Sequence, residues 1–363
     1  MVFVIRKKDP RYKEWKRRND ERKFIRNYIS KQKKKKRRKN KVLNNTTRRP
    51  RNKQKPDKVF LVPTVFSIID NPEQTISFLN DMIKEVEKIR RLYKVNKHNY
   101  IRLFSIKMDH TTKITGDALM YLLTIIKNTR GEKILPINWV GTFPKDDYMK
   151  QFLKNSGYLN YMKTAEENLV HTNNHIQIQT GYGYEYKEGN EMVDIRQKII
   201  DFSCEKMNKN KTQLNYLMTM LTEMITNIKD HAYDTINIFE PSWYIFVENN
   251  PCEVIYTFMD NGLGIPTTIK KKKIELLMSS ISLDKEYKYI EAGVSGLEKR
   301  SQTGKTERGN GLPSIYEQYR NNKVDRLVII SNKAYFETEN SRDLKNELHG
   351  TIFYWKIKKE ERT

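Results

Sequence analysis

The sequence predicts an α/β protein in which two folded parts follow a basic N-terminal arm. Three observations lead to this prediction: the charge is segregated, strands alternate with helices over residues 59–163, and two helices followed by two strands begin near Glu191. A chain of 363 residues is long enough for two ordinary domains and a tail. We therefore expect an arm over residues 1–58, an α/β domain over 59–163, a linker over 164–189 and a second domain over 190–363.

Charge separates the arm from the rest of the chain. Residues 1–58 hold 26 of the 69 Lys and Arg residues but only 5 of the 44 Asp and Glu residues. Dense like charges repel one another and bury little apolar surface, so the arm is expected to be disordered when alone. It is suited to bind nucleic acid or another polyanion, because phosphate contacts need only cations. A solvated tail without a partner is the alternative.

Cysteine and apolar patterning indicate the compartment. Cys204 and Cys252 are the two cysteines, and they suggest neither a disulfide framework nor a zinc site. The N-terminus lacks the apolar run of a secretory signal. The longest apolar stretch, residues 118–126, is about half as long as a membrane-spanning helix. We expect a soluble, cytoplasmic protein that does not contact the membrane.

Residues 59–163 alternate between strand and helix patterns. Strands are predicted over residues 59–69, 100–108 and 134–140, and helices over 72–93, 118–127 and 146–154. This alternation predicts helices packed against a mixed sheet. Residues 164–189 then contain a predicted edge strand at 175–179.

About 100 residues of this first part resemble a STAS domain, the fold of anti-sigma-factor antagonists. The resemblance rests on a strand ending at Asp109, a helix starting near Thr115, and the segment FLKNSGYLNYM. It implies a protein partner for this part of the chain. STAS domains carry a phosphorylatable Ser or Thr where Asp117 stands here. Asp117 is expected to cap the helix, or alternatively to mimic a phosphate, and Thr115 is the nearest hydroxyl.

Glu223 and Asn227 introduce the chemistry of the second part. They are four residues apart on a predicted helix, so they share one face. A carboxylate there can orient or deprotonate a water, and an amide oxygen can ligate a hard cation. Spacing alone would also fit an ordinary exposed helix face.

Three glycine-containing segments follow in order. Asp260, Gly262 and Gly264 come directly after an apolar strand, where glycine allows close approach of a ligand and an Asp can accept a hydrogen bond from an exocyclic amine. A tight turn would also explain them. Next, Gly309 and Gly311 stand at the start of a helix, where free amides form a ready phosphate site. Finally, Gly350 and Thr351 precede an apolar run.

Together, these segments resemble the gyrase, heat-shock chaperone, histidine kinase and MutL (GHKL) superfamily over about residues 190–357. The resemblance implies a two-layer α/β sandwich, the Bergerat fold, that binds ATP with Mg²⁺. By position, it assigns the adenine amino group to Asp260 with support from Thr351. It assigns Mg²⁺ to Asn227 and places Glu223 where hydrolytic members keep a general base.

The resemblance also implies a phosphate site and a lid. Gly309 and Gly311 would line the phosphates with backbone N–H groups, and residues 267–308 would form the ATP lid. Lys305 or Arg308 in that lid could reach the γ-phosphate. Residues 303–306 imitate the end of a P-loop, but Lys299 stands where a P-loop requires glycine, so they are assigned to the lid.

Three functions remain as alternatives. The first is a nucleotide-gated ATPase switch, in bacterial signalling or defence. The second is a Ser/Thr protein kinase of the anti-sigma type, which the ATP domain resembles most. The third is an ATP-dependent nucleic-acid-binding module that uses the arm. A phosphorelay kinase is disfavoured because the helix over residues 192–207 has no histidine. Homodimer formation is left open.

Overall fold

The computed structural model describes residues 55–96, 101–130, 135–162, 173–182, 190–231, 239–271, 284–296 and 311–360. The predicted arm lies almost entirely outside these residues, and so does the P-loop-like segment 303–306. By their contacts, residues 56–363 form one unit, separate from residues 1–55. The sheets and helices of the described residues all belong to the larger unit.

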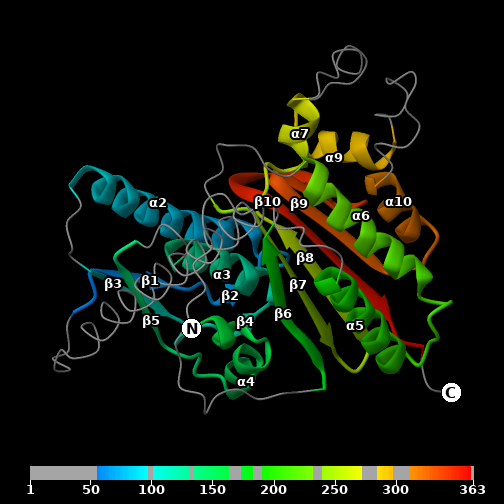
Figure 1. Cartoon of the computed structure of the whole chain (residues 1–363), viewed down its shortest axis with the longest axis horizontal. Helices are drawn as coiled ribbons and strands as arrows, with labels where there is room; N and C mark the ends of the chain where they lie inside the picture. Colours follow the sequence, from blue (N-terminus) through cyan, green and yellow to red (C-terminus); the bar gives the residue numbers. More distant parts are fainter. Residues whose placement is uncertain are drawn as a thin grey trace, which may run out of the picture. The chain divides into compact units, whose positions relative to one another are not determined.

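The first layer contains a three-stranded parallel sheet with the strand order β1-β3-β5 (Figure 1). Its strands are β1 (Lys58–Leu61), β3 (Arg102–Lys107) and β5 (Ile137–Gly141). Its helices are α2 (Pro72–Asn96), α3 (Gly116–Arg130), α4 (Asp147–Asn155) and the 3-10 helix η1 (Tyr158–Tyr161). A short parallel pair joins β2 (Val65–Phe66) to β4 (Lys113–Ile114).

The predicted helices and strands of this layer are present, with two differences. The strand predicted over residues 59–69 is divided into β1 and β2, with Pro63 between them. Proline has no backbone N–H, so it interrupts strand pairing. The predicted mixed sheet is instead parallel, because a helix connects β1 to β3 and another connects β3 to β5.

Asp117 does more than place a charge in the first turn of α3. It is 1% exposed, and its Oδ2 accepts hydrogen bonds from the backbone N–H groups of Ile68 at 2.5 Å and Ile69 at 3.4 Å. Burial raises the pKa of this carboxyl to about 6. The side chain expected to cap α3 thus ties the helix to the segment that follows β2.

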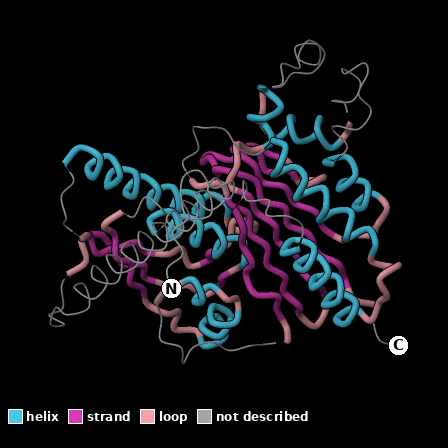
Figure 2. Tube along the Cα trace, viewed as in Figure 1, coloured by secondary structure: helices cyan, strands magenta, loops and turns pink. Residues whose placement is uncertain are grey.

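The second sheet has five antiparallel strands in the order β6-β7-β8-β10-β9 (Figures 1 and 2). They are β6 (His175–Tyr182), β7 (Ser242–Asn249), β8 (Glu253–Asp260), β9 (Arg326–Phe336) and β10 (Arg342–Lys358). The accompanying helices are α5 (Asn190–Met207), α6 (Asn215–His231), α7 (Ile265–Lys271), α9 (Tyr287–Val294) and α10 (Gly311–Arg320). The predicted order of helices and strands after Glu191 is confirmed in the described residues. The predicted edge strand at residues 175–179 is also present, as part of β6.

Both faces of the five-stranded sheet are buried. On β7, Tyr244 and Phe246 join a core that contains α2 and α3, while Trp243, Ile245 and Val247 join a second core under α5, α6, α9 and α10. The same alternation continues through β8, β9 and β10. Figure 1 shows α5, α6 and α10 on one side of the sheet and α2 and α3 on the other. The predicted two-layer sandwich thus carries a third layer, supplied by the N-terminal α/β part.

Contact between α3 and the sheet depends on a small residue. Gly116, the first residue of α3, lies so close to β7 that an added Cβ would be 2.2 Å from Phe246 Cδ1. Further along α3, the buried Tyr121 hydroxyl accepts a hydrogen bond from the His349 backbone N–H at 3.0 Å. These contacts fix the first layer against β7 and β10.

Candidate functional site

Helices α6 and α10 bring three predicted site residues together. Glu223 and Asn227 lie on α6, and Gly311 is the first residue of α10. An added Cβ on Gly311 would lie 3.0 Å from Glu223 Oε2 and 3.1 Å from Asn227 Oδ1. The carboxylate and the amide therefore share one helix face, as their spacing predicts, and both meet the start of α10. A side chain at position 311 would displace one of them.

Asp260 ends β8 inside the protein. It is 8% exposed, and its Oδ1 accepts a hydrogen bond from the Gly262 backbone N–H at 2.8 Å. Burial raises the pKa of the Asp260 carboxyl to about 7, although the hydrogen bond from Gly262 acts in the opposite direction. Asp260 is thus a largely desolvated acceptor that titrates near neutral pH.

Strand β10 brings Gly350 and Thr351 against Asp260. Thr351 is paired with Asp260 across the β8–β10 ladder. Gly350 has φ +117°, and an added Cβ would be 2.1 Å from the Asp260 carbonyl oxygen. The buried Thr351 hydroxyl is 3.0 Å from Ser331 Oγ. The sequence pattern puts Gly350 and Thr351 at the head of a strand, but they lie inside β10, after the strand's irregular first half.

The loop after β8 is held by side chains on both sides. The Asn261 amide accepts from the Ser242 N–H at 2.7 Å and donates to the Glu240 carbonyl at 2.7 Å. Gly264 has φ +86°, the left-handed conformation expected for it. An added Cβ on Gly264 would be 2.2 Å from Asn332 Oδ1, so protein packing by itself requires glycine there.

The site therefore has two described halves, Glu223 with Asn227 and Gly311, and Asp260 with Gly350 and Thr351. Lys305, Arg308 and Gly309 lie outside the described residues. Of the segment predicted as lid, residues 267–271 of α7 and residues 284–296, which include α9, are described. Ile290 of α9 is fully buried in the core that also contains Ile315 of α10 and Ile329 of β9. At least this part of the segment is packed into the fold.

The two halves offer complementary chemistry. The first turn of α10 has N–H groups without partners inside the helix, which favour an anion. Amide and carboxylate oxygens on α6 can face a hard cation. Among the described residues, no group of three or more His, Cys, Asp or Glu side chains could hold a metal ion. Mg²⁺ commonly binds through one or two protein ligands together with phosphate oxygens and water.

Sequence motifs do not identify Ser331, Asn332 and Glu347, which also surround the site. Ser331 Oγ accepts a hydrogen bond from the Ile265 N–H at 2.8 Å, and Asn332 donates to the Leu263 carbonyl at 3.1 Å. Both bonds support the loop after Asp260. The sequence does contain one signal for Ser331 and Asn332: with Lys333 they form a polar run inside the otherwise apolar strand LVIISNKAYF.

The buried Asp260 carboxyl leads to a pH-dependent prediction. A raised folded-state pKa contributes stability below about pH 4, which is lost as the pH rises through about 7. Asp260→Asn removes this titration. The free energy of unfolding of the variant relative to wild type should therefore increase by about 2 kcal/mol between pH 5 and pH 8. Urea unfolding of the nucleotide-free proteins measures it, and an equal difference at both pH values would contradict burial of the charge.

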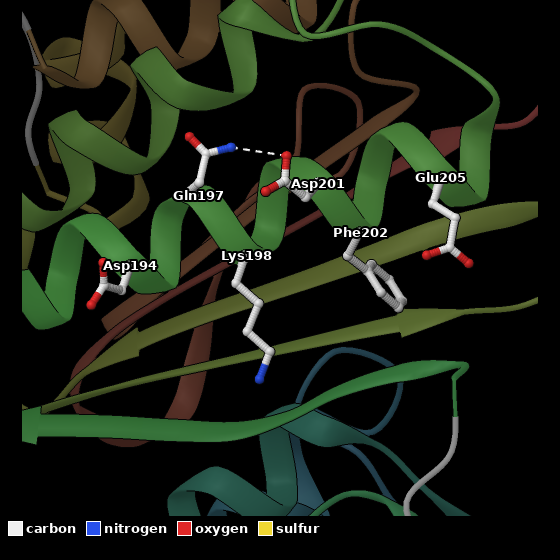
Figure 3. Close-up of a pocket in the computed structure, with 6 residues that line it drawn as sticks. All are labelled: Asp194, Gln197, Lys198, Asp201, Phe202 and Glu205. Carbon is white, nitrogen blue, oxygen red and sulfur yellow. Dashed lines mark hydrogen bonds between the residues drawn. The ribbon is translucent and has the colours of Figure 1, made fainter.

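A surface pocket of about 510 Å³ lies along α5 and contains none of the predicted site residues (Figure 3). Its lining residues are all on one helix: Asp194, Gln197, Lys198, Asp201, Phe202 and Glu205. The Gln197 amide donates to Asp201 at 2.9 Å, and the hydrogen bonds from Lys211 and Gln197 lower the pKa of Asp201. Unlike the surroundings of Asp260, the lining of this pocket contains no glycine, and its acidic residues are exposed.

Comparisons with known proteins do not assign a family to this chain. No family model matches this chain, and no curated protein sequence is significantly similar to it. Within the described part of the chain, no helix combines the length and apolar character needed to cross a bilayer.

Proposed function

We propose that residues 190–357 form a GHKL-type domain that binds ATP with Mg²⁺. The observation that carries this proposal is the convergence of Glu223 and Asn227 on Gly311, at the start of α10. Two helices that are far apart in sequence thereby place a carboxylate, an amide and free helix amides in one location. The buried Asp260, with Thr351 opposite it, supplies the second half of the arrangement.

Each residue has a distinct role in this proposal. Asp260 accepts a hydrogen bond from the adenine amino group, and Thr351 supports it from β10. Asn227 holds Mg²⁺, which neutralises phosphate charge when it is bound. The α10 amides, beginning at Gly311, bind phosphate oxygens. Glu223 orients or deprotonates the water that attacks the γ-phosphate.

We further propose that the protein is an ATPase switch whose state is read by residues 59–163, a STAS-like layer. Two observations support this choice: the first layer has parallel strands with helices, and α2 and α3 share a core with the sheet of the ATP domain. Nucleotide-dependent movement of the sheet would reach this layer without a separate partner. Such a switch would suit cytoplasmic signalling or defence, with a protein partner bound at this layer.

The anti-sigma-type kinase is the second candidate function, favoured by the resemblance of the N-terminal layer to a STAS substrate. Asp117, at the position of the acceptor in that family, is 1% exposed and holds two backbone N–H groups. A kinase would therefore act on another protein and not on this position. Polyanion binding by residues 1–58 remains compatible with either function, because it depends on the charge of the arm.

The test of ATP binding compares wild type with Asp260→Ala by calorimetry in the presence of Mg²⁺. The variant should bind about 10- to 100-fold more weakly, because the adenine amine loses a charged acceptor. Asp201→Ala, which removes an exposed acid on α5, is the matched control and should bind like wild type. Equal affinity of wild type and Asp260→Ala, or no binding by wild type, would refute the proposal.

A further inference from the structure

The first half of β10 leaves regular pairing just before the nucleotide site. Its register with β9 shifts twice, between Asp343 and Leu348 and again between Leu348 and Thr351. Extra residues in one strand form a bulge, which turns side chains in new directions. Here the bulged segment, residues 343–350, ends at Gly350, directly against Asp260.

On its nucleotide-site side, the bulge reaches the loop after Asp260 through Asn332. Glu347 Oε1 accepts from Asn332 Nδ2 at 3.3 Å, and the same amide donates to the Leu263 carbonyl at 3.1 Å. Thr267 donates to Asn332 Oδ1 at 3.3 Å. Asn332 itself is 5% exposed and has φ +52°, a conformation that asparagine tolerates better than most residues. One side chain thus holds both ends of the turn that contains Gly264.

On its other side, the bulge is held by α2. The Asn80 amide donates to the Glu347 carbonyl at 3.0 Å. About two turns earlier on the helix, the Glu73 carboxylate accepts from the Lys345 N–H at 3.1 Å. Helix α2 therefore contacts the residue whose side chain holds Asn332.

We propose that Asn332 and Glu347 position residues 262–268, the loop after β8 together with the first turn of α7, and that they link this loop to helix α2 of the first layer. The functional consequence rests on the proposed nucleotide binding: a change at α2 would alter ATP affinity through Asn80, Glu347 and Asn332. Asn332 and Glu347 are positioning residues: Asn332 bonds Leu263 and Thr267 on either side of Gly264, and Glu347 acts through its bond to Asn332. The link gives the first layer a defined physical route to the nucleotide site.

Asn332→Gly isolates the role of the amide. Glycine keeps the left-handed conformation and removes the side chain, so backbone strain is not added. Asn322→Gly is the matched control, because Asn322 also has positive φ but is exposed in the turn before β9. Hydrogen exchange without nucleotide should show the amides of residues 263–265, 267 and 268 exchanging about tenfold faster in Asn332→Gly, since losing hydrogen bonds of this kind costs about one factor of ten. The control should leave these amides unchanged.

Mg-ATP affinity then tests the consequence. Asn332→Gly and Glu347→Ala should each weaken binding about fivefold, while Glu347→Gln, which keeps an acceptor oxygen, should restore wild-type affinity. Asn80→Ala should weaken binding about twofold and should be non-additive with Asn332→Gly, because the two residues share Glu347. Asp81→Ala, at an exposed neighbouring position on α2 where the side chain pairs with Lys84, should have no effect.

The outcomes separate the two proposals. Faster loop exchange with weaker ATP binding supports both. Faster loop exchange in a protein whose wild type does not bind ATP supports the positioning role and refutes the nucleotide function. Unchanged loop exchange in both Asn332→Gly and Glu347→Ala overturns the positioning role. Identical behaviour of Asn80→Ala and Asp81→Ala in the exchange and affinity measurements overturns the link to α2.

Discussion

Gly350→Ala is expected to lower the free energy of unfolding by more than about 3 kcal/mol, from a positive φ and a steric clash together. The residue has φ +117°, which side chains rarely adopt. An added Cβ would also stand 2.1 Å from the Asp260 carbonyl oxygen and 2.9 Å from Asn261 Cα. Both contacts are with backbone, at the last residue of the central strand β8 and at the residue that follows it, so neither atom can move aside without distorting the sheet. Urea unfolding monitored by circular dichroism measures the loss.

Gly141→Ala is the control for Gly350→Ala. Gly141 ends β5, an edge strand, and its nearest contact to an added Cβ is the Ile106 carbonyl at 3.2 Å. The change should alter stability by no more than about 1 kcal/mol, since alanine also reduces the entropy of the unfolded chain. Equal losses in the two variants would mean that the close approach of Gly350 to Asp260 is not a determinant of stability.

Glu223→Gln is expected to lower ATP-dependent phosphate release by about 100-fold or more, the usual size of a general-base contribution. Glutamine keeps the size of the side chain and one acceptor oxygen, so Mg-ATP affinity should stay within about threefold of wild type. The measurement follows phosphate release and protein phosphorylation together, in single-turnover and steady-state conditions.

Glu205→Gln provides the matched control for Glu223→Gln, because Glu205 is an exposed helical acid on α5. It should release phosphate at the wild-type rate. Phosphate release that is unaffected by Glu223→Gln would exclude Glu223 as the base. Labelled protein in place of free phosphate would instead select the kinase over the ATPase switch.

Much of the fold could be predicted because it depends on local patterns. The periodic apolar residues of α2 and the strongly apolar run of α3 define helices without knowledge of their partners. In the second part, the four-residue spacing of Glu223 and Asn227 already places them on one face, and Asp260 follows directly from the end of an apolar strand. Each of these inferences needs only neighbouring residues.

The arrangement of the layers could not be predicted in the same way, because it depends on contacts between distant segments. One local signal was present: Trp243 to Val247 are apolar at successive positions, which is typical of a strand buried on both faces. The left-handed Asn332 and the bulge of β10 had no comparable signal. Both arise where the strand pairing of β9 and β10 is interrupted, and pairing register is a property of two strands together.

The two-sided burial of the five-stranded sheet has a consequence for cooperativity. Removing residues 59–163 would uncover Tyr244, Phe246, Val328 and Ile330, which are buried apolar side chains on one face of the sheet. Exposing that face to water would lower the stability of the part of the chain that carries Asp260 and Glu223. That part of the chain and residues 59–163 therefore stabilise each other, and the two are expected to melt in a single transition.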